Sequence, residues 1–161
     1  MSLRLLMLTT VPLLPITVHA GELPKEGSRS FTNTWVLTSS TPIKVEDRTF
    51  GTYEISGVSR NDGDDVMTDM GMRCLGIYYV AGTAFLEGHG ACSYTDKDGD
   101  QIMVTAEEKT EGNGTETLVA GTGKFAGISG AGDFTTLKFP VKADDKFSRG
   151  IVKAHWNWKI Q

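Results

Sequence analysis

Glu87 and His89 are the two residues of this sequence whose types and spacing best suit acid/base chemistry. They lie two positions apart in the stretch Thr83–Tyr94, which also contains Phe85. Alternate residues of an extended strand share a face about 7 Å apart, so the carboxylate would lie near the imidazole. If that face lines an apolar interior, the pair is a candidate catalytic acid and base. If the face lies outside, both side chains are simply solvated, as most charged groups are.

Three further residues are candidates for contact with a bound ligand. Phe85 shares the predicted face of Glu87 and His89, Arg73 precedes Cys74, and His155 lies near the C-terminus. Each could face the interior or the solvent, and the sequence leaves this open.

The segment Asp96–Asp100 resembles part of a calcium-binding loop. Asp96, Asp98, Asp100 and Glu107 imitate ligand positions of an EF-hand, but Gln101 stands where the loop needs Gly. Asp98-Gly99 also suits a hairpin turn. We therefore predict no metal site, with weak surface binding of Ca²⁺ as the alternative.

The glycine-rich segment 121–132 imitates a dinucleotide-binding loop through Gly121, Gly123 and Ala126. Pyrophosphate binding needs a helix N-terminus after the loop, and here another strand is predicted instead. We predict no cofactor, and read the glycines as places where a curved sheet bends.

The N-terminus reads as an export signal. Arg4 is followed by the apolar run Leu5–Val18 and then by His19-Ala20, which fits a signal peptide over residues 1–20 cleaved after Ala20. We expect one domain over residues 21–161, periplasmic or secreted. The formal charge of −4 argues against nucleic-acid binding.

The rest of the chain has the pattern of antiparallel β-structure. Short alternating stretches are separated by turn residues such as Asp62-Gly63 and Asn113-Gly114. The predicted strands are Phe31–Ser39, Phe50–Ser59, Val66–Tyr79, Thr83–Tyr94, Gln101–Lys109, Thr115–Gly121, Ser129–Phe139 and Phe147–Ile160. Eight such strands can close into a barrel whose interior is filled or holds one small ligand.

The last predicted strand alternates most clearly. Val152, Ala154, Trp156, Trp158 and Ile160 share one face, and lysines, His155 and Asn157 share the other. The other strands lack a wholly apolar face about ten residues long, so we expect no membrane insertion after signal cleavage. The sequence leaves the oligomeric state open.

The two cysteines, Cys74 and Cys92, suit a disulfide in an oxidising compartment. If Val66–Tyr79 and Thr83–Tyr94 form a hairpin centred near Thr83, the two lie opposite each other, within bonding range. A register slip of two residues would separate them.

Gly-Thr-Gly-Lys-Phe-Ala-Gly-Ile-Ser-Gly-Ala-Gly at 121–132 resembles the signature of the allene oxide cyclase barrel superfamily, which includes dirigent proteins. The segments 88–94 and 96–100 are similar to exported bacterial members. The resemblance, over roughly residues 31–160, implies an eight-stranded barrel around an apolar cavity. It favours a binding protein for a small apolar molecule. A cofactor-independent cyclase or isomerase, or dirigent-like steering of a reactive substrate, is the alternative.

Overall fold

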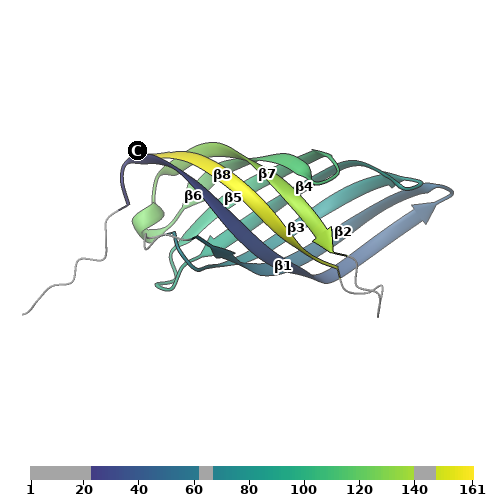
Figure 1. Cartoon of the computed structure of the whole chain (residues 1–161), viewed down its shortest axis with the longest axis horizontal. Coiled ribbons are helices and arrows are strands. Elements are labelled where there is room, and N and C mark those ends of the chain that lie inside the picture. The colour runs from purple at the N-terminus through teal and green to yellow at the C-terminus, as the bar shows by residue number, and fades with distance from the viewer. Residues whose placement is uncertain (1–22, 62–66, 140–147) are drawn as a thin grey trace, which may run out of the picture.

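The protein is a closed barrel of eight antiparallel strands, seen here in a computed structural model that describes residues 23–61, 67–139 and 148–161. Each strand pairs with the next, and β8 pairs with β1 to close the barrel (Figure 1). The elements are β1 (Glu26–Val45), β2 (Arg48–Arg60), β3 (Met70–Ala81), β4 (Ala84–Thr95), β5 (Gln101–Thr110), β6 (Asn113–Gly121), the 3₁₀ helix η1 (Gly123–Phe125), β7 (Ile128–Phe139) and β8 (Arg149–Ile160). The predicted eight-stranded barrel is confirmed. The predicted export signal lies outside the described residues.

β1 and β2 are longer than the sequence pattern predicts. β1 continues past a bulge between Leu37 and Ser39 and turns at Glu46-Asp47 into β2. The pairing of β1 with β8 ends at Val36, so among the described strands the far half of β1 pairs with β2 alone. Pro42 lacks a backbone N–H and is tolerated in this half because only one side of the strand is paired. At this end of the barrel β2 stays paired with β3 as far as Arg48 and Ala81, so within the described residues the far half of β1 is an edge of the sheet.

The opposite end of the barrel is filled by aromatic side chains. Phe31, Tyr94 and Trp156 pack edge to face, with ring centroids 4.6 Å apart for Phe31–Trp156 and 4.9 Å for Tyr94–Trp156. Phe125 of η1 is fully buried beside them in the same core. Such edge-to-face packing places the positive ring edge against the negative face of the next ring. This end is the closed, solid part of the barrel.

Cys74 and Cys92 form the predicted disulfide. They lie directly opposite each other on β3 and β4, with their Cα atoms 4.0 Å apart. Both side chains face the interior and are almost fully buried. A buried disulfide fits folding in an oxidising compartment outside the cytoplasm.

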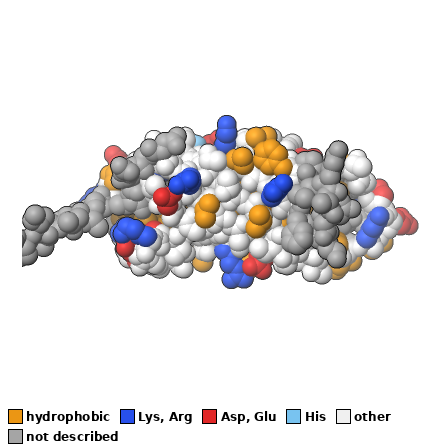
Figure 2. All heavy atoms as spheres, turned by 60° about the horizontal axis from the view of Figure 1, so that its bottom comes forward, with side chains coloured by type: hydrophobic (Ala, Val, Ile, Leu, Met, Phe, Trp, Pro, Cys, Tyr) orange, Lys and Arg blue, Asp and Glu red, His pale blue; other side chains and the backbone are white. Residues whose placement is uncertain are grey.

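The outer surface carries scattered apolar residues among charged ones. Val36, Leu75 and Leu137 are about half exposed. On the face drawn in Figure 2, hydrophobic side chains form mostly separate patches between charged side chains. Among the described residues, no helix is long and apolar enough to cross a bilayer.

Candidate functional site

A cavity of about 480 Å³ occupies the barrel interior beyond the aromatic core. Its lining reaches Thr83 in the turn between β3 and β4 and Glu111 in the turn between β5 and β6. It therefore extends to the barrel end opposite η1. Its inner wall ends at Tyr94, which belongs to the aromatic core. We call the Tyr94 end the floor and the Thr83 end the mouth.

The cavity wall is mainly apolar and aromatic. The strands alternate, so their inward positions bring large side chains such as Trp35, Tyr53, Tyr78 and Phe134 to the wall. Small residues such as Gly88 and Ala106 between them leave the central space. Cavities of this size and character are typical binding sites for small molecules.

Glu116 is a buried acid at the floor. It lies on β6, is 4% exposed, and its Oε2 accepts a hydrogen bond from Trp156 Nε1 at 2.5 Å. Burial raises the pKa of Glu116 from 4.5 to about 7, and the Trp156 hydrogen bond offsets only part of that effect. Glu116 is thus a carboxyl group that can hold or release a proton near neutral pH.

Gly132 makes the contact between Glu116 and Trp156 possible. Gly132 pairs with Glu116 on one side and with Trp156 on the other. A Cβ atom at Gly132 would lie 2.6 Å from the indole Cδ1 of Trp156, far inside van der Waals contact. The absent side chain lets the indole reach across β7 to the carboxyl group.

Tyr94 and Asn33 complete the polar part of the floor. Asn33 Nδ2 donates a hydrogen bond to the Tyr94 hydroxyl at 3.0 Å, and both side chains are almost fully buried. Burial and then the charge of Glu116 raise the pKa of Tyr94, against the opposing effect of the Asn33 hydrogen bond. Tyr94 therefore stays protonated. The floor offers a neutral hydroxyl, an amide and a titratable carboxyl group.

The structure places Glu87 and His89 on the outside of the barrel. They are 59% and 48% exposed, and His89 Nε2 lies 3.8 Å from Glu87 Oε2. The prediction that they share a face with Phe85 is wrong, because Leu86 is an extra residue in a bulge: Tyr79 pairs with Glu87, whereas Val80 pairs with Phe85. Neither residue lines the cavity. A catalytic role for the pair stays a prediction, but not one inside the barrel.

Of the three predicted ligand contacts, only Phe85 lines the cavity. Arg73 is 62% exposed on the outside and forms an ion pair with Glu54 at 2.8 Å. His155 is on the outer face of β8, where its Nδ1 lies 2.9 Å from Ser30 Oγ. Arg73 and His155 alternate with the inward-facing Cys74 and Trp156, so neither can reach an interior ligand.

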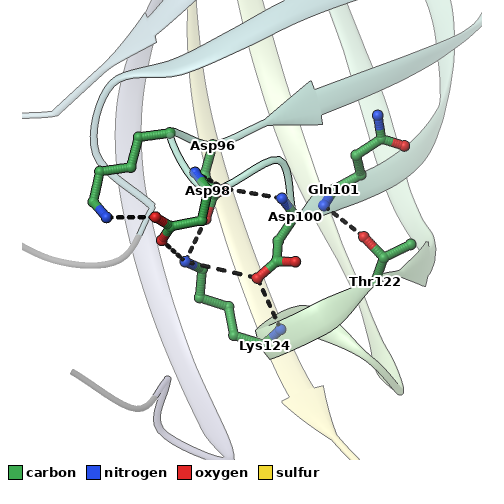
Figure 3. A network of polar contacts seen from close by, with 7 residues as sticks. Asp96, Asp98, Asp100, Gln101, Thr122 and Lys124 are labelled. Carbon is green, nitrogen blue, oxygen red and sulfur yellow. Dashed lines mark hydrogen bonds and ion pairs between the residues drawn. The ribbon is translucent and has the colours of Figure 1, made fainter. Parts of the chain in front are cut away.

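The acidic loop between β4 and β5 surrounds a lysine (Figure 3). Lys124 Nζ lies 2.5 Å from Asp96 Oδ2, 2.7 Å from Asp98 Oδ2 and 3.8 Å from Asp100 Oδ2. Hydrogen bonds from Lys124 and then Lys97 lower the pKa of Asp98 to about 2. Among the described residues, no group of three acidic, His or Cys side chains is arranged to hold a metal ion. The ammonium group of Lys124 takes the place that a cation would have.

The floor residues were not predicted from the sequence, although one signal was present. Glu116 lies two positions before Leu118, so alternation puts it on the inward face of β6. That signal is weak on its own, because a charged residue on an inward face usually argues against the assumed register. The contact with Trp156 spans 40 positions in the sequence and depends on the register of three strands.

Two solved structures have a similar backbone. The pterocarpan synthase dirigent protein GePTS1 matches with a TM-score of 0.50 and 14% identity, covering 94% of this chain and 98% of its own. The pterocarpan synthase dirigent protein PsPTS1 matches with a TM-score of 0.53 and 15% identity, covering 85% of this chain and 96% of its own. No protein-family model matches the sequence. No curated protein matches it either. At sequence identities this low, the two matches show a shared fold and nothing more.

Proposed function

Since this chain has the eight-stranded barrel fold of the dirigent proteins, as its resemblance to the allene oxide cyclase barrel superfamily predicted, we propose that it binds a small apolar molecule in the barrel interior. The observation that carries the proposal is the cavity of about 480 Å³ with its mainly apolar wall. The buried Cys74–Cys92 disulfide and the predicted signal peptide favour a place of action outside the cytoplasm.

Native mass spectrometry of the mature protein purified from its own host tests the proposal. We expect a co-purifying mass that is released on unfolding. The matched variants Ala106→Phe and Ala91→Phe show whether the bound molecule lies in the cavity or on the outer surface. Ala106 lines the cavity, whereas Ala91 is exposed on the outer face of β4. Uptake should be lost in Ala106→Phe and kept in Ala91→Phe. Equal uptake by both variants would place the molecule outside the barrel.

A second candidate function is proton-transfer catalysis on the bound molecule, as in a cyclase or isomerase. It is favoured by Glu116, whose pKa of about 7 suits an acid or base at neutral pH. The nearby Tyr94 hydroxyl supplies a neutral hydrogen-bond donor at the same floor. The cavity would add positioning of the substrate, which lowers barriers substantially even without further groups.

Glu116→Gln separates the two functions. The amide keeps the shape of the side chain and can still accept the Trp156 hydrogen bond, but it cannot exchange a proton. Binding alone predicts full uptake by the variant. Catalysis predicts uptake together with loss of conversion of the bound molecule, followed by mass spectrometry. Conversion at the wild-type rate would remove Glu116 from any mechanism.

A further inference from the structure

The charged groups that line the cavity are mostly acidic. They are three glutamates, Glu108, Glu111 and Glu116, and one lysine, Lys138. Among the described lining residues there is no arginine or histidine. The acidic excess is found at both ends, because Glu116 lies at the floor and the other two glutamates lie near the mouth.

At the mouth, the charge of Lys138 is already shared between two carboxylates. Its Nζ lies 4.0 Å from Glu108 Oε1 and 3.7 Å from Glu111 Oε1, and 5.2 Å above the ring of Phe85. Glu108 is 20% exposed and also accepts the backbone N–H of Gly112 at 2.6 Å. Glu111 is 66% exposed, so solvent screens much of its charge. Among the described residues that line the mouth, no positive charge is therefore left unshared for an anion.

At the floor, Glu116 has a hydrogen-bond donor but no cation within the described part of the chain. The groups facing it are the Trp156 indole of β8, the Tyr94 hydroxyl of β4 and the neighbouring Asn33 amide of β1. The buried Arg29 does not line the cavity and has contacts of its own. The Tyr94 hydroxyl could donate a hydrogen bond to an anion, yet no described residue lining the floor supplies a compensating positive charge. An anion that loses its water here would remain uncompensated, which is strongly unfavourable.

We propose that the cavity selects its ligand by charge, accepting neutral or cationic amphipathic molecules and excluding those with a carboxylate head. This inference rests on the function proposed above. A hydroxyl or ammonium head can donate to a glutamate at either end. A carboxylate head meets Glu116 at the floor, and at the mouth it meets Glu108 and Glu111, which already share the charge of Lys138, so the selection holds for both orientations of the ligand.

Decylamine, decanol and decanoic acid test the selection, because they share one chain and differ in the head. Each competes with the neutral fluorescent probe N-phenyl-1-naphthylamine at low salt and about pH 8, where Glu116 is ionised. We expect the apparent dissociation constants of the amine and the alcohol to be at least about tenfold lower than that of the acid. In Glu116→Gln the ratio between the dissociation constant of the acid and those of the other two molecules should become smaller. In Glu87→Gln, a change on the outer surface, this ratio should stay the same.

The outcomes separate this inference from the proposed function. Equal displacement by all three molecules, or tightest displacement by decanoic acid, overturns charge selection while leaving cavity binding intact. If neither the probe nor any of the three molecules binds, cavity binding fails and the selection fails with it. Displacement that persists in Ala106→Phe would be binding to the outer surface and would also overturn the inference.

Discussion

Replacing Glu116 by Gln should make the protein more stable at high pH. Burial raises the pKa of this carboxyl group from 4.5 to about 7, so the folded state binds the proton more tightly than the unfolded chain. The free energy of unfolding must then fall as the pH rises from about 4.5 to about 7, and stay low above that range. At about 1.4 kcal/mol per pKa unit the loss is about 3 kcal/mol. Glutamine carries no charge to desolvate, so Glu116→Gln should lack this loss.

Urea unfolding followed by tryptophan fluorescence measures the effect, since Trp35 and Trp156 are buried. At about pH 8 we expect Glu116→Gln to unfold with a free energy up to about 3 kcal/mol above that of the wild type, and at about pH 4.5 within about 1 kcal/mol of it. Glu87→Gln is the control, because Glu87 is exposed. Parallel pH profiles for wild type and Glu116→Gln would refute the reasoning, since no other group differs between them.

Three further predictions concern the frame around the cavity. Replacing Cys74 and Cys92 by Ala opens a cross-link of sequence separation 18 and should lower the free energy of unfolding by about 3 kcal/mol in a urea titration; a fall below about 1 kcal/mol would show that the hairpin is held without it. Gly132→Ala should cost about 2 kcal/mol in the same assay, because the new Cβ would lie 2.1 Å from the carbonyl oxygen of His155; an unchanged midpoint would contradict the close approach. Lys124→Met should return the pKa of Asp98 from about 2 toward its ordinary value in an NMR titration; a pKa that stays near 2 would mean that Lys97 alone lowers it.

Features that depend on local alternation could be predicted from the sequence. The inward face of β8, with Ala154 and Trp156, follows from the two-residue period and is confirmed by burial. The predicted pairing of Cys74 with Cys92 is also confirmed. The bulge at Leu86 lies between the turn and the cysteines and adds one residue to β4, so Cys74 meets Cys92 rather than Ala91.

Features that depend on the third dimension could not be predicted. A one-residue bulge leaves no clear mark in the sequence, yet it separates Phe85 from Glu87 and His89 by moving them to opposite faces. The extension of β1 was not predicted because a proline such as Pro42 argues against a strand, unless one side of that strand is known to be unpaired. The buried Glu116 was missed because its donor, Trp156, reaches it across an intervening strand.

The lysine inside the acidic loop has a consequence for where such a protein can work. Outside the cytoplasm, the concentrations of divalent ions are not regulated by the cell. In this chain the counter-ion is Lys124, which is covalently attached and cannot be washed out or captured by a chelator. Asp100 also accepts a hydrogen bond from the backbone N–H of Lys124, so the acidic loop is bonded directly to η1. We therefore expect the solid end of the barrel to keep its shape in calcium-rich and calcium-poor surroundings alike.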